Sequence, residues 1–404
     1  MDIAVIGGGA AGFFAAITAK ENYPDASVVI FEKSQKILAK VQVSGGGRCN
    51  LTNGCASINE LAEGYPRGGK ALKRAFRTFD NQATMQWFES RGVPLVIEED
   101  GCVFPQSQDS QSIIDCFLEQ TRKLNIEIKL GSAIKTMQKV GDKLQCDFVG
   151  KAVPSRTFDR VIVATGGSPK RSELEWLEKL NHKIAAPVPS LFTFKMPDEP
   201  VEDLMGVVVE NTLLSIQGTK LKSEGPLLIT HWGMSGPAVL KLSAFGARVL
   251  SEKNYDFNIQ VNWTNVRNND AVLAQLQGVV KDHPKKILAN FRPFGLADRL
   301  WSSLLEKCGL SANKKWEELG KAGLNKLVNV LTNDVYAVRG QTQFREEFVT
   351  CGGVSLESID FNTMQSRVCE NLYFAGEVMD IDGITGGYNF QAAWTTAFIA
   401  AKLN

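Results

Sequence analysis

A glycine-rich turn between a strand and a helix opens the chain, and it restricts the fold more than any other feature. Residues 7–12 read Gly-Gly-Gly-Ala-Ala-Gly and match the pattern GxGxxG. An apolar strand is expected before the turn at Ile3–Ile6, a helix after it at Ala10–Lys20, and a second β-branched strand at Ser27–Phe31. In this setting the pattern predicts a Rossmann βαβ unit that binds a dinucleotide.

Each residue type in this unit suits a dinucleotide for a physical reason. Gly7 permits the tight turn, Gly9 lets backbone N–H groups approach the pyrophosphate, and Gly12 lets the helix pack closely on the sheet. Glu32 ends the second strand about twenty residues further on, where a carboxylate accepts both ribose hydroxyls. The helix N-terminus adds partial positive charge beside the phosphates. The residues expected at this half of the cofactor are Gly7, Gly9, Ala10, Ala11, Gly12, Glu32 and Lys33.

Three later segments favour FAD over NAD as the dinucleotide. Residues 161–167 form an apolar strand that ends in a small-residue turn, as flavoproteins use beside the pyrophosphate. Residues 372–377 form another strand that ends in Gly and Glu, and this acid is placed to bond the ribityl chain. Residues 386–390 open the last helix, whose N-terminus suits the electron-rich edge of a flavin. The residues expected to contact FAD here are Ala164, Thr165, Gly166, Gly376, Glu377, Gly387, Tyr388, Asn389 and Phe390.

Two side-chain roles in the last segment stay open at this point. Tyr388 is as suited to packing on the flavin ring as to donating a proton. Asp380 and Asp382 precede Gly383 and suit either a cofactor contact or plain turn chemistry.

Changes in composition along the chain indicate a discontinuous organisation. With 404 residues, the chain is too long for one core, so two or three domains are expected. Short alternating strands follow Leu191, helical composition follows Asn268, and strand character returns after Val328. We predict an FAD-binding domain made of residues 1–190 plus 345–404. It is interrupted by a β-rich insert (191–265 plus 325–344) and a helical insert (266–324).

Charge and cysteine usage exclude several other classes of protein. The formal net charge of +1 predicts no strong overall attraction to nucleic acid or anionic membrane. The eight cysteines are scattered without a CxxC pair or a zinc-like spacing, so no metal site is expected. No apolar run approaches the roughly 20 residues of a membrane span, and the first expected strand directly follows Met1. We therefore expect a cytoplasmic protein with free cysteines.

A second glycine-rich segment carries a family resemblance. Residues 44–53 read SGGGRCNLTN, which resembles the SGGGRCNxTN block of the aminoacetone oxidase/BaiN-like flavoprotein family. Residues 230–238 (THWGMSGPA), 351–354 (CGGV) and 376–394 (from GEV to AAW) are similar to three further blocks of that family, in the same order.

The resemblance implies an α/β fold in which a glutathione-reductase-like, two-dinucleotide FAD domain carries a β-barrel-like insert and a helical insert. It also implies an FAD-dependent oxidoreductase. Family members are credited with oxidation of a small aminoketone, reduction of bile-acid intermediates and reduction of a uridine in large-subunit ribosomal RNA. We expect a small organic substrate, with a ribosomal RNA uridine as the alternative and a non-catalytic flavin-binding protein as the least favoured reading. The further residues expected at the cofactor are Lys40, Ser44, Gly45, Arg48, Cys49, Asn50 and Ile134.

Candidates for proton and electron transfer are few. His231, in the THWGMSGPA block, is placed by the resemblance to deliver the proton that accompanies hydride transfer. The alternative is a structural block in which Thr230 and Ser235 cap a helix that begins near Pro237. Since no second GxGxxG is present, NADH and NADPH both remain open as the electron donor.

The cysteine pair Cys49 and Cys55 argues against a flavin disulfide reductase. Such enzymes carry CxxxxC, and this pair has one residue too many. On a helix, six positions rotate the side chain by about 240°, so the two thiols would point to different sides.

A group of basic residues follows this region. Lys70, Lys73, Arg74 and Arg77 have the spacing of one helix face, and Arg67 lies just before them. Such a face suits RNA phosphates. The near-zero net charge favours a plain solvated surface instead.

Overall fold

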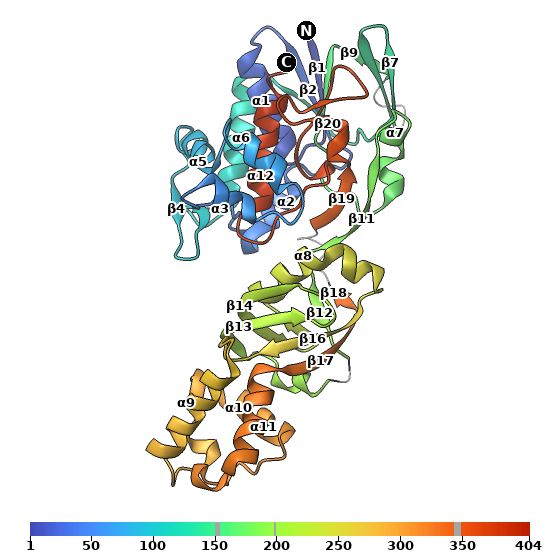
Figure 1. Cartoon of the computed structure of the whole chain (residues 1–404). Helices are drawn as coiled ribbons and strands as arrows, with labels where there is room; N and C mark the ends of the chain where they lie inside the picture. The colour runs from blue at the N-terminus through green and yellow to red at the C-terminus, as the bar shows by residue number, and fades with distance from the viewer. Residues whose placement is uncertain (150–153, 198, 343–348) are drawn as a thin grey trace. The chain divides into compact units, whose positions relative to one another are not determined.

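The computed structural model of the chain describes residues 1–149, 154–197, 199–342 and 349–404. The chain divides into two compact units (Figure 1). One contains the described residues of Met1–Ser190 and Phe344–Asn404, and the other contains those of Leu191–Gln343. The domain boundary predicted between residues 344 and 345 lies outside the described residues.

The first unit is built on a seven-stranded sheet to which both ends of the chain contribute. Its strand order is β20-β21-β22-β10-β1-β2-β6, and the five strands from β22 to β6 are parallel. The N-terminal strand β1 therefore lies at the centre of these five. Bounds in strand order are β20 (Ile359–Asp360), β21 (Gln365–Ser366), β22 (Leu372–Phe374), β10 (Arg160–Val163), β1 (Asp2–Ile6), β2 (Ser27–Phe31) and β6 (Glu127–Lys129).

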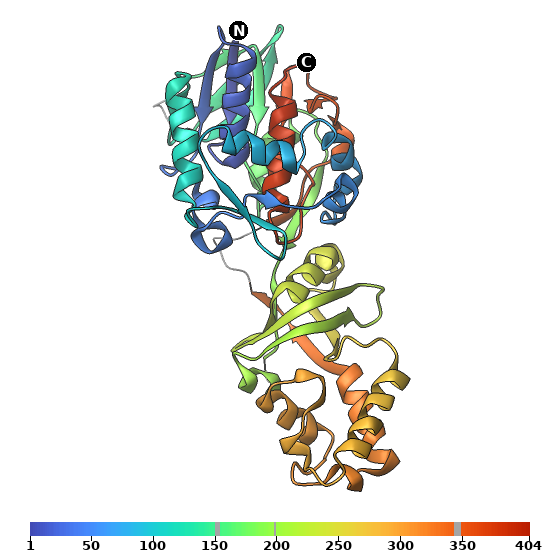
Figure 2. The same cartoon turned by 90° about the vertical axis from the view of Figure 1, so that its left-hand side faces the viewer.

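Two helices from opposite ends of the chain cover the centre of this sheet. In both views, α1 (Ala10–Asn22) and α12 (Tyr388–Ala400) lie side by side (Figures 1 and 2). Each is buried over most of its length, which is why small and apolar residues occur on all their faces. The flanking helix α6 (Gln111–Lys123) is amphipathic and turns Phe117 toward Trp394 of α12.

The other elements of the first unit form small sheets and short helices around this core. One sheet joins β3, β5 and β4, another joins β7, β8 and β9, and β11 pairs with β19. The strands are β3 (Thr52–Asn53), β4 (Leu95–Ile97), β5 (Cys102–Pro105), β7 (Ile134–Val140), β8 (Lys143–Phe148), β9 (Arg156–Phe158), β11 (Ile184–Ser190) and β19 (Val349–Val354). The helices are α2 (Ala39–Val43), α3 (Ile58–Glu63), α4 (Gly69–Ala75), α5 (Asn81–Glu89) and α7 (Glu175–Glu178).

The second unit has its own apolar core, and its described residues form an antiparallel sheet, four α-helices and short 3-10 turns. The strand order is β17-β16-β13-β14-β15-β12-β18. The strands are β12 (Thr193–Lys195), β13 (Val208–Ile216), β14 (Lys222–Thr230), β15 (Gly233–Ser235), β16 (Asp256–Asn262), β17 (Asp334–Arg339) and β18 (Gln341–Thr342). The helices are α8 (Pro237–Glu252), α9 (Asn269–Asp282), α10 (Asp298–Lys307) and α11 (Gly320–Thr332).

Two details of the second unit differ from the sequence-based expectation. The 16-residue helix α8 interrupts the stretch expected to be short strands, and its Ala and Leu positions pack on β14. Helix α11 continues to Thr332, so the strand expected after Val328 begins only at Asp334. Within the described residues, no helix combines the length and apolar character that crossing a bilayer requires.

Candidate cofactor site

The Gly7–Gly12 turn is packed so tightly that side chains are excluded at both of its ends. Gly7 has a φ of +117°, and a Cβ atom there would lie 2.3 Å from the carbonyl oxygen of Ala164. A Cβ on Gly12 would lie 1.9 Å from the carbonyl oxygen of Gly7. At Gly9, by contrast, a Cβ would meet nothing within 4 Å. Open space therefore lies beside Gly9, while Gly8 packs against Glu32.

Glu32 is fixed against this turn by backbone donors. Its Oε2 accepts from Gly8 N at 2.7 Å, and its Oε1 accepts from Ser34 N at 2.8 Å. Helix α1 begins beside it at Ala10, and the first N–H groups of a helix have no acceptor within it. Positive partial charge and a carboxylate thus lie at the same end of the parallel strands.

The loop before β7 reaches the same end of the sheet. Ser132 N donates to the carbonyl of Glu32 at 2.8 Å, which brings Ile134 at the start of β7 near the end of β2. Lys33 points into solvent and pairs with Glu173 at 3.4 Å, with 68% of its side chain exposed.

A cluster of polar groups surrounds the turn after β10. Glu377 accepts from Thr350 N at 2.9 Å through Oε1 and from Lys40 Nζ at 2.8 Å through Oε2. A Cβ on Gly167 would lie 2.5 Å from Glu377 Oε1 and 2.6 Å from Thr350 Oγ1. Glu377, Thr350 and the 164–167 turn therefore form one cluster. Sequence analysis missed Thr350, although the neighbouring CGGV block marked this segment.

Three buried oxygens near these segments lack a hydrogen-bond partner among the described residues: Thr165 Oγ1, Thr350 Oγ1 and Asn50 Oδ1. Buried polar atoms are nearly always paired with protein, water or a ligand. All three lie in segments that contain residues predicted to contact the cofactor or that adjoin them. The chain thus offers a cradle whose free polar atoms and open glycines fit a dinucleotide.

The SGGGRCNLTN loop folds through consecutive left-handed glycines. Gly45, Gly46 and Gly47 have φ values of +58°, +68° and +88°. Ser44 lies at the start of this turn, and its carbonyl accepts from Cys49 N at 2.9 Å.

Arg48 is held by neighbouring side chains in this structure. It donates to Glu98 at 2.8 Å and to Gln108 at 2.9 Å, and its guanidinium lies 3.9 Å from the centroid of Phe104. Its expected contact with the cofactor would require these partners to be shared or exchanged.

Cys49 and Cys55 are both free and buried. Burial raises the pKa of the Cys49 thiol to about 12, so it is protonated near neutral pH. A protonated thiol is a poor nucleophile and a poor redox centre.

The SGGGRCNLTN loop and the start of α12 form one structure, although they are far apart in sequence. Asn53 Nδ2 donates to the carbonyl of Gly386 at 3.1 Å, and Trp394 Nε1 donates to that of Leu51 at 2.9 Å. A Cβ on Gly387 would lie 2.3 Å from the carbonyl of Thr52, so only glycine fits there. Helix α12 therefore begins against β3, with the N–H groups of its first turn available.

The side chains of the first turn of α12 mostly contact other parts of the protein. Asn389 donates to the carbonyl of Gly383 at 3.0 Å and accepts from its N–H at 2.8 Å, so only its backbone is free for a ligand. Phe390 stacks on Trp394 with ring centroids 5.5 Å apart. The hydroxyl of Tyr388 lies 3.5 Å from Cys55 Sγ, and burial raises the pKa of this phenol.

Asp382 is a structural anchor in this fold. Its side chain is completely buried and accepts hydrogen bonds from both Nε and Nη2 of Arg67. Ser190 Oγ donates a third hydrogen bond to it at 2.6 Å. Of the two roles left open for Asp382, a cofactor contact or turn structure, these contacts support turn structure. They also correct the placement of Arg67, which points inward and does not belong to the exposed basic group. Spacing alone cannot give the direction of a side chain that precedes a helix.

His231 belongs to the second unit. It lies exposed on the turn between β14 and β15, with its ring edge-to-face with Trp232 at 4.4 Å. Thr230 Oγ1 donates within this turn to Gly233, and Gly236 precedes α8 without a side-chain cap. The helix of the structural alternative does begin at Pro237, but the capping of that helix by Thr230 and Ser235 is wrong. Among the described residues, no group of three or more His, Cys, Asp or Glu side chains is placed to hold a metal.

Comparison with known proteins places this architecture. The family model described as "HI0933-like protein Rossmann domain" matches residues 1–403. The chain is 26% identical to a 3-dehydro-bile acid delta(4,6)-reductase of Clostridium scindens, over 99% of this chain and 98% of the relative. It is 29% identical to a ribosomal RNA dihydrouridine synthase of Escherichia coli, over 99% of this chain and 97% of the relative.

Solved structures agree at the level of the fold. A 3-ketosteroid-delta4-(5alpha)-dehydrogenase of Rhodococcus jostii superposes with a TM-score of 0.51 at 13% identity, covering 99% of this chain and 96% of that one. A 3-ketosteroid delta1-dehydrogenase of Sterolibacterium denitrificans gives 0.52 at 11% identity, covering 99% and 98%. The predicted α/β, Rossmann-like fold class is confirmed.

Proposed function

This chain belongs to the HI0933-like Rossmann-domain family, and we propose that it reduces a carbon–carbon double bond conjugated to a carbonyl group in a small organic molecule. The predicted family resemblance is confirmed by the family match and by the bile-acid reductase relative. The chain is an FAD-dependent oxidoreductase, as the sequence predicted.

The observation that carries FAD binding, on which the proposal rests, is a set of three buried side-chain oxygens without a hydrogen-bond partner among the described residues. Thr165 Oγ1 and Thr350 Oγ1 lie at the turn after β10, and Asn50 Oδ1 lies in the SGGGRCNLTN loop. At Gly9, just before α1, a Cβ would meet nothing within 4 Å. We assign the pyrophosphate to the first turn of α1, the adenosine ribose to Glu32, and the ribityl chain to Glu377 and its neighbours. The first turn of α12 then serves the flavin ring through the N–H groups of Tyr388, Asn389 and Phe390.

The substrate class is inferred from what the two kinds of relative have in common. One is named as a reductase of delta(4,6) double bonds in a 3-dehydro bile acid, and the other as a synthase of dihydrouridine. In the first case the double bonds are conjugated with a 3-keto group, and in the second the uracil double bond is conjugated with a ring carbonyl. Conjugation makes the carbon β to the carbonyl electron-poor, so it accepts hydride, and the α carbon then takes a proton.

The residues of this chain would contribute orientation, charge and a proton. FAD, when bound, supplies or accepts the hydride. The N-terminus of α12 favours negative charge placed at its end. We keep His231 as the proposed proton donor, since its exposed ring lies on a short turn between paired strands and is accessible to a ligand.

NADH or NADPH is the proposed electron donor, and an anaerobic mixing experiment tests it. Purified, FAD-loaded protein is mixed with each nucleotide while flavin absorbance is followed. Bleaching by either one supports a reductase. Failure of both, together with rapid reoxidation of a substrate-reduced form by oxygen, would replace the proposal with an oxidase.

Reduction of a uridine in ribosomal RNA is the second candidate. The exposed Lys70, Lys73, Arg74 and Arg77 favour it, because no ion pair engages their side chains in the part of the chain that the structure describes. Dihydrouridine in RNA isolated before and after incubation with the enzyme and its donor tests this candidate. We also infer a cytoplasmic location, since no disulfide joins any of the cysteines in the part of the chain that the structure describes.

A further inference from the structure

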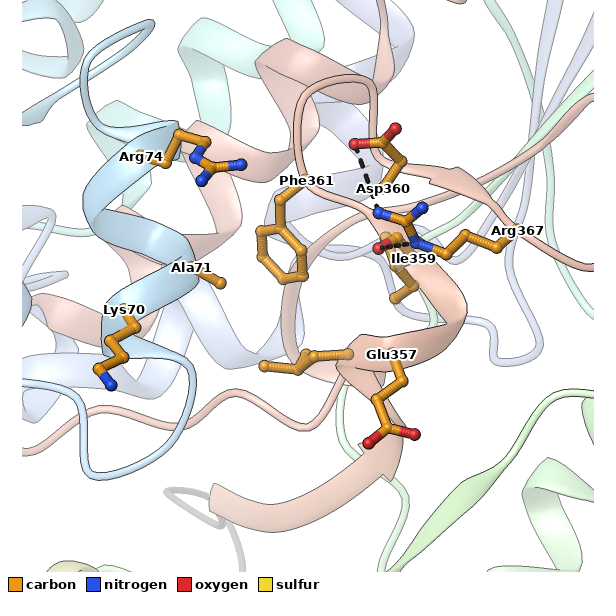
Figure 3. A pocket seen from close by; sticks show the side chains of 9 residues that line it. Lys70, Ala71, Arg74, Glu357, Ile359, Asp360, Phe361 and Arg367 are labelled. Atoms are coloured by element: carbon orange, nitrogen blue, oxygen red, sulfur yellow. Dashed lines mark hydrogen bonds and ion pairs between the residues drawn. The ribbon is translucent and has the colours of Figure 1, made fainter.

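A surface pocket of about 450 Å³ lies in the first unit, between α4 and the segment that surrounds β20. One wall is the face of α4 that carries Lys70, Ala71 and Arg74 (Figure 3). The opposite wall is formed by Leu356, Glu357, Ile359, Asp360, Phe361 and Arg367. None of these residues belongs to the candidate cofactor site.

The charges of the two walls differ in whether they are already paired. On the second wall, Arg367 Nη2 lies 3.9 Å from Asp360 Oδ1, and Arg367 Nε donates a hydrogen bond to the carbonyl of Ile359 at 3.1 Å. Glu357 pairs with Lys183 at 3.4 Å. On α4, the side chains of Lys70 and Arg74 are exposed, and within the described ranges neither makes a hydrogen bond or ion pair. The pocket therefore has two uncompensated cations on one wall.

The basic residues in and after α4 do not share the single helix face expected from their spacing. Lys70 and Arg74 lie one turn apart on α4 and line the pocket. Lys73 on α4 and Arg77, which lies beyond the helix end at Ala75, are exposed and do not line it. Side chains one turn apart have Cβ atoms about 5–6 Å from each other, which lets two cations hold the same phosphate group.

The interior of the pocket is apolar. Phe361 is half-buried and lies between α4 and the Asp360–Arg367 pair (Figure 3), and Leu356 and Ile359 complete the lining. A partly exposed aromatic ring beside cations is the arrangement on which nucleic-acid bases stack. Glu357 and Asp360, at the opposite side, are acceptors for hydroxyl or amino groups and would repel a second group of phosphates.

We infer that this pocket binds one nucleotide unit, with its phosphate between Lys70 and Arg74 and its base on Phe361. The volume lies within the usual range of small-molecule sites, about 300–1,000 Å³. Nucleotide chemistry has two sources for a flavoenzyme of this family, an RNA chain and a nicotinamide dinucleotide. The inference goes beyond the proposed function, because mononucleotide binding here does not depend on the reaction at the flavin.

Binding is tested with FAD-saturated protein, so that the dinucleotide cradle is not available to the added nucleotide. Uridine and adenosine 5′-monophosphates are titrated calorimetrically, with inorganic phosphate as the reference. The pocket variant is Lys70→Ala/Arg74→Ala, and its matched control is Lys73→Ala/Arg77→Ala, which removes the same charge from neighbouring exposed positions that do not line the pocket. Thermal melts of both variants check that they fold.

We expect the pocket variant to weaken mononucleotide binding about tenfold or more, because it loses charge-assisted contacts to phosphate. Phe361→Ala weakens it about fivefold or more through lost stacking, while the control stays within about twofold. Equal losses in both double variants, or nucleotides binding no tighter than inorganic phosphate, would overturn the inference.

Two further arms identify the source of the nucleotide. If it is the electron donor, the pocket variant raises the KM for NADPH or NADH and leaves binding of a single-stranded oligouridylate unchanged. If it is RNA, oligouridylate binding weakens and both KM values stay constant. A pocket variant that changes neither quantity would contradict the assignment.

Discussion

Lys40 and Glu377 are 337 positions apart in the sequence, yet Lys40 Nζ lies 2.8 Å from Glu377 Oε2. The contact joins helix α2 to the segment that follows β22, beside the turn after β10. Because the Lys40 side chain is 49% exposed, such a pair adds little to stability. Its consequence is positional, since it fixes the carboxylate of Glu377 at the candidate cofactor site.

Glu377→Gln is expected to weaken FAD binding about tenfold and to leave the melting temperature of the apoprotein nearly unchanged. The amide keeps one acceptor but loses the charge that holds Lys40, so the group is no longer fixed. Titration of apoprotein with FAD, followed by flavin fluorescence, measures the change. Glu173→Gln, which also removes an acid paired with an exposed lysine, is the control. Equal FAD affinity in the two variants would remove Glu377 from the site.

Gly9→Ala and Gly12→Ala are expected to fail in different ways. Gly9 has an ordinary extended backbone and free space for a Cβ, so the variant folds but obstructs the approach of the pyrophosphate. Gly12 has no such space, and its variant loses about 1–3 kcal/mol of unfolding free energy through overpacking. Urea unfolding of the apoproteins and FAD titration separate the two effects. A Gly9→Ala protein that binds FAD normally would argue against the assigned pyrophosphate site.

Arg67→Met is expected to destabilise the protein by about 3–5 kcal/mol, because it leaves the buried Asp382 carboxylate without its cation. Burial raises the pKa of Asp382 above its ordinary value even with Arg67 present. A carboxyl whose folded-state pKa is raised contributes most to stability below its unfolded pKa, and the contribution is lost as pH rises through the folded value. The loss in Arg67→Met is therefore larger at pH 7 than at pH 5.

Urea unfolding of wild type and Arg67→Met at the two pH values measures this difference. Replacing both partners, as in Arg67→Met/Asp382→Leu, should recover much of the loss, since no buried charge remains. Equal destabilisation at pH 5 and pH 7 would show that Asp382 does not titrate against Arg67.

Cys49 is expected to resist alkylation by iodoacetamide at pH 8 in the folded protein and to react once the protein is unfolded. Burial both blocks access and raises the pKa of the thiol to about 12. Mass spectrometry of peptides from native and urea-treated samples locates the label, with the partly exposed Cys102 as an internal reference. Rapid labelling of Cys49 in the native state would reopen a thiol-based mechanism.

Local features of the sequence predicted the fold class. Contacts between segments that are distant in sequence could not be predicted from such features. The Rossmann unit could be predicted because its signals, the GxGxxG turn, the strand periodicity and Glu32, lie close together along the chain. The bond from Asn53 to Gly386 spans 333 positions and has no local signal. For the same reason, Thr350 was missed and Arg67 was placed on the wrong surface. A helix start near Pro237 was among the expectations, but the 16-residue length of α8 was not predicted because β-rich segments flank it on both sides.

The central claim is that this flavoenzyme transfers hydride to a conjugated double bond, and reoxidation of the reduced enzyme tests it most directly. FAD-loaded protein is photoreduced without oxygen, which avoids the need to know the natural donor. It is then mixed with 2-cyclohexen-1-one, a 3-keto-4-ene steroid or a uridine-containing RNA, with cyclohexanone and cyclohexene as controls. We predict that at least one conjugated compound restores oxidised-flavin absorbance and is recovered with its double bond saturated, while both controls leave the flavin reduced. A flavin that stays reduced with every conjugated compound, or that the controls reoxidise equally well, would contradict the account.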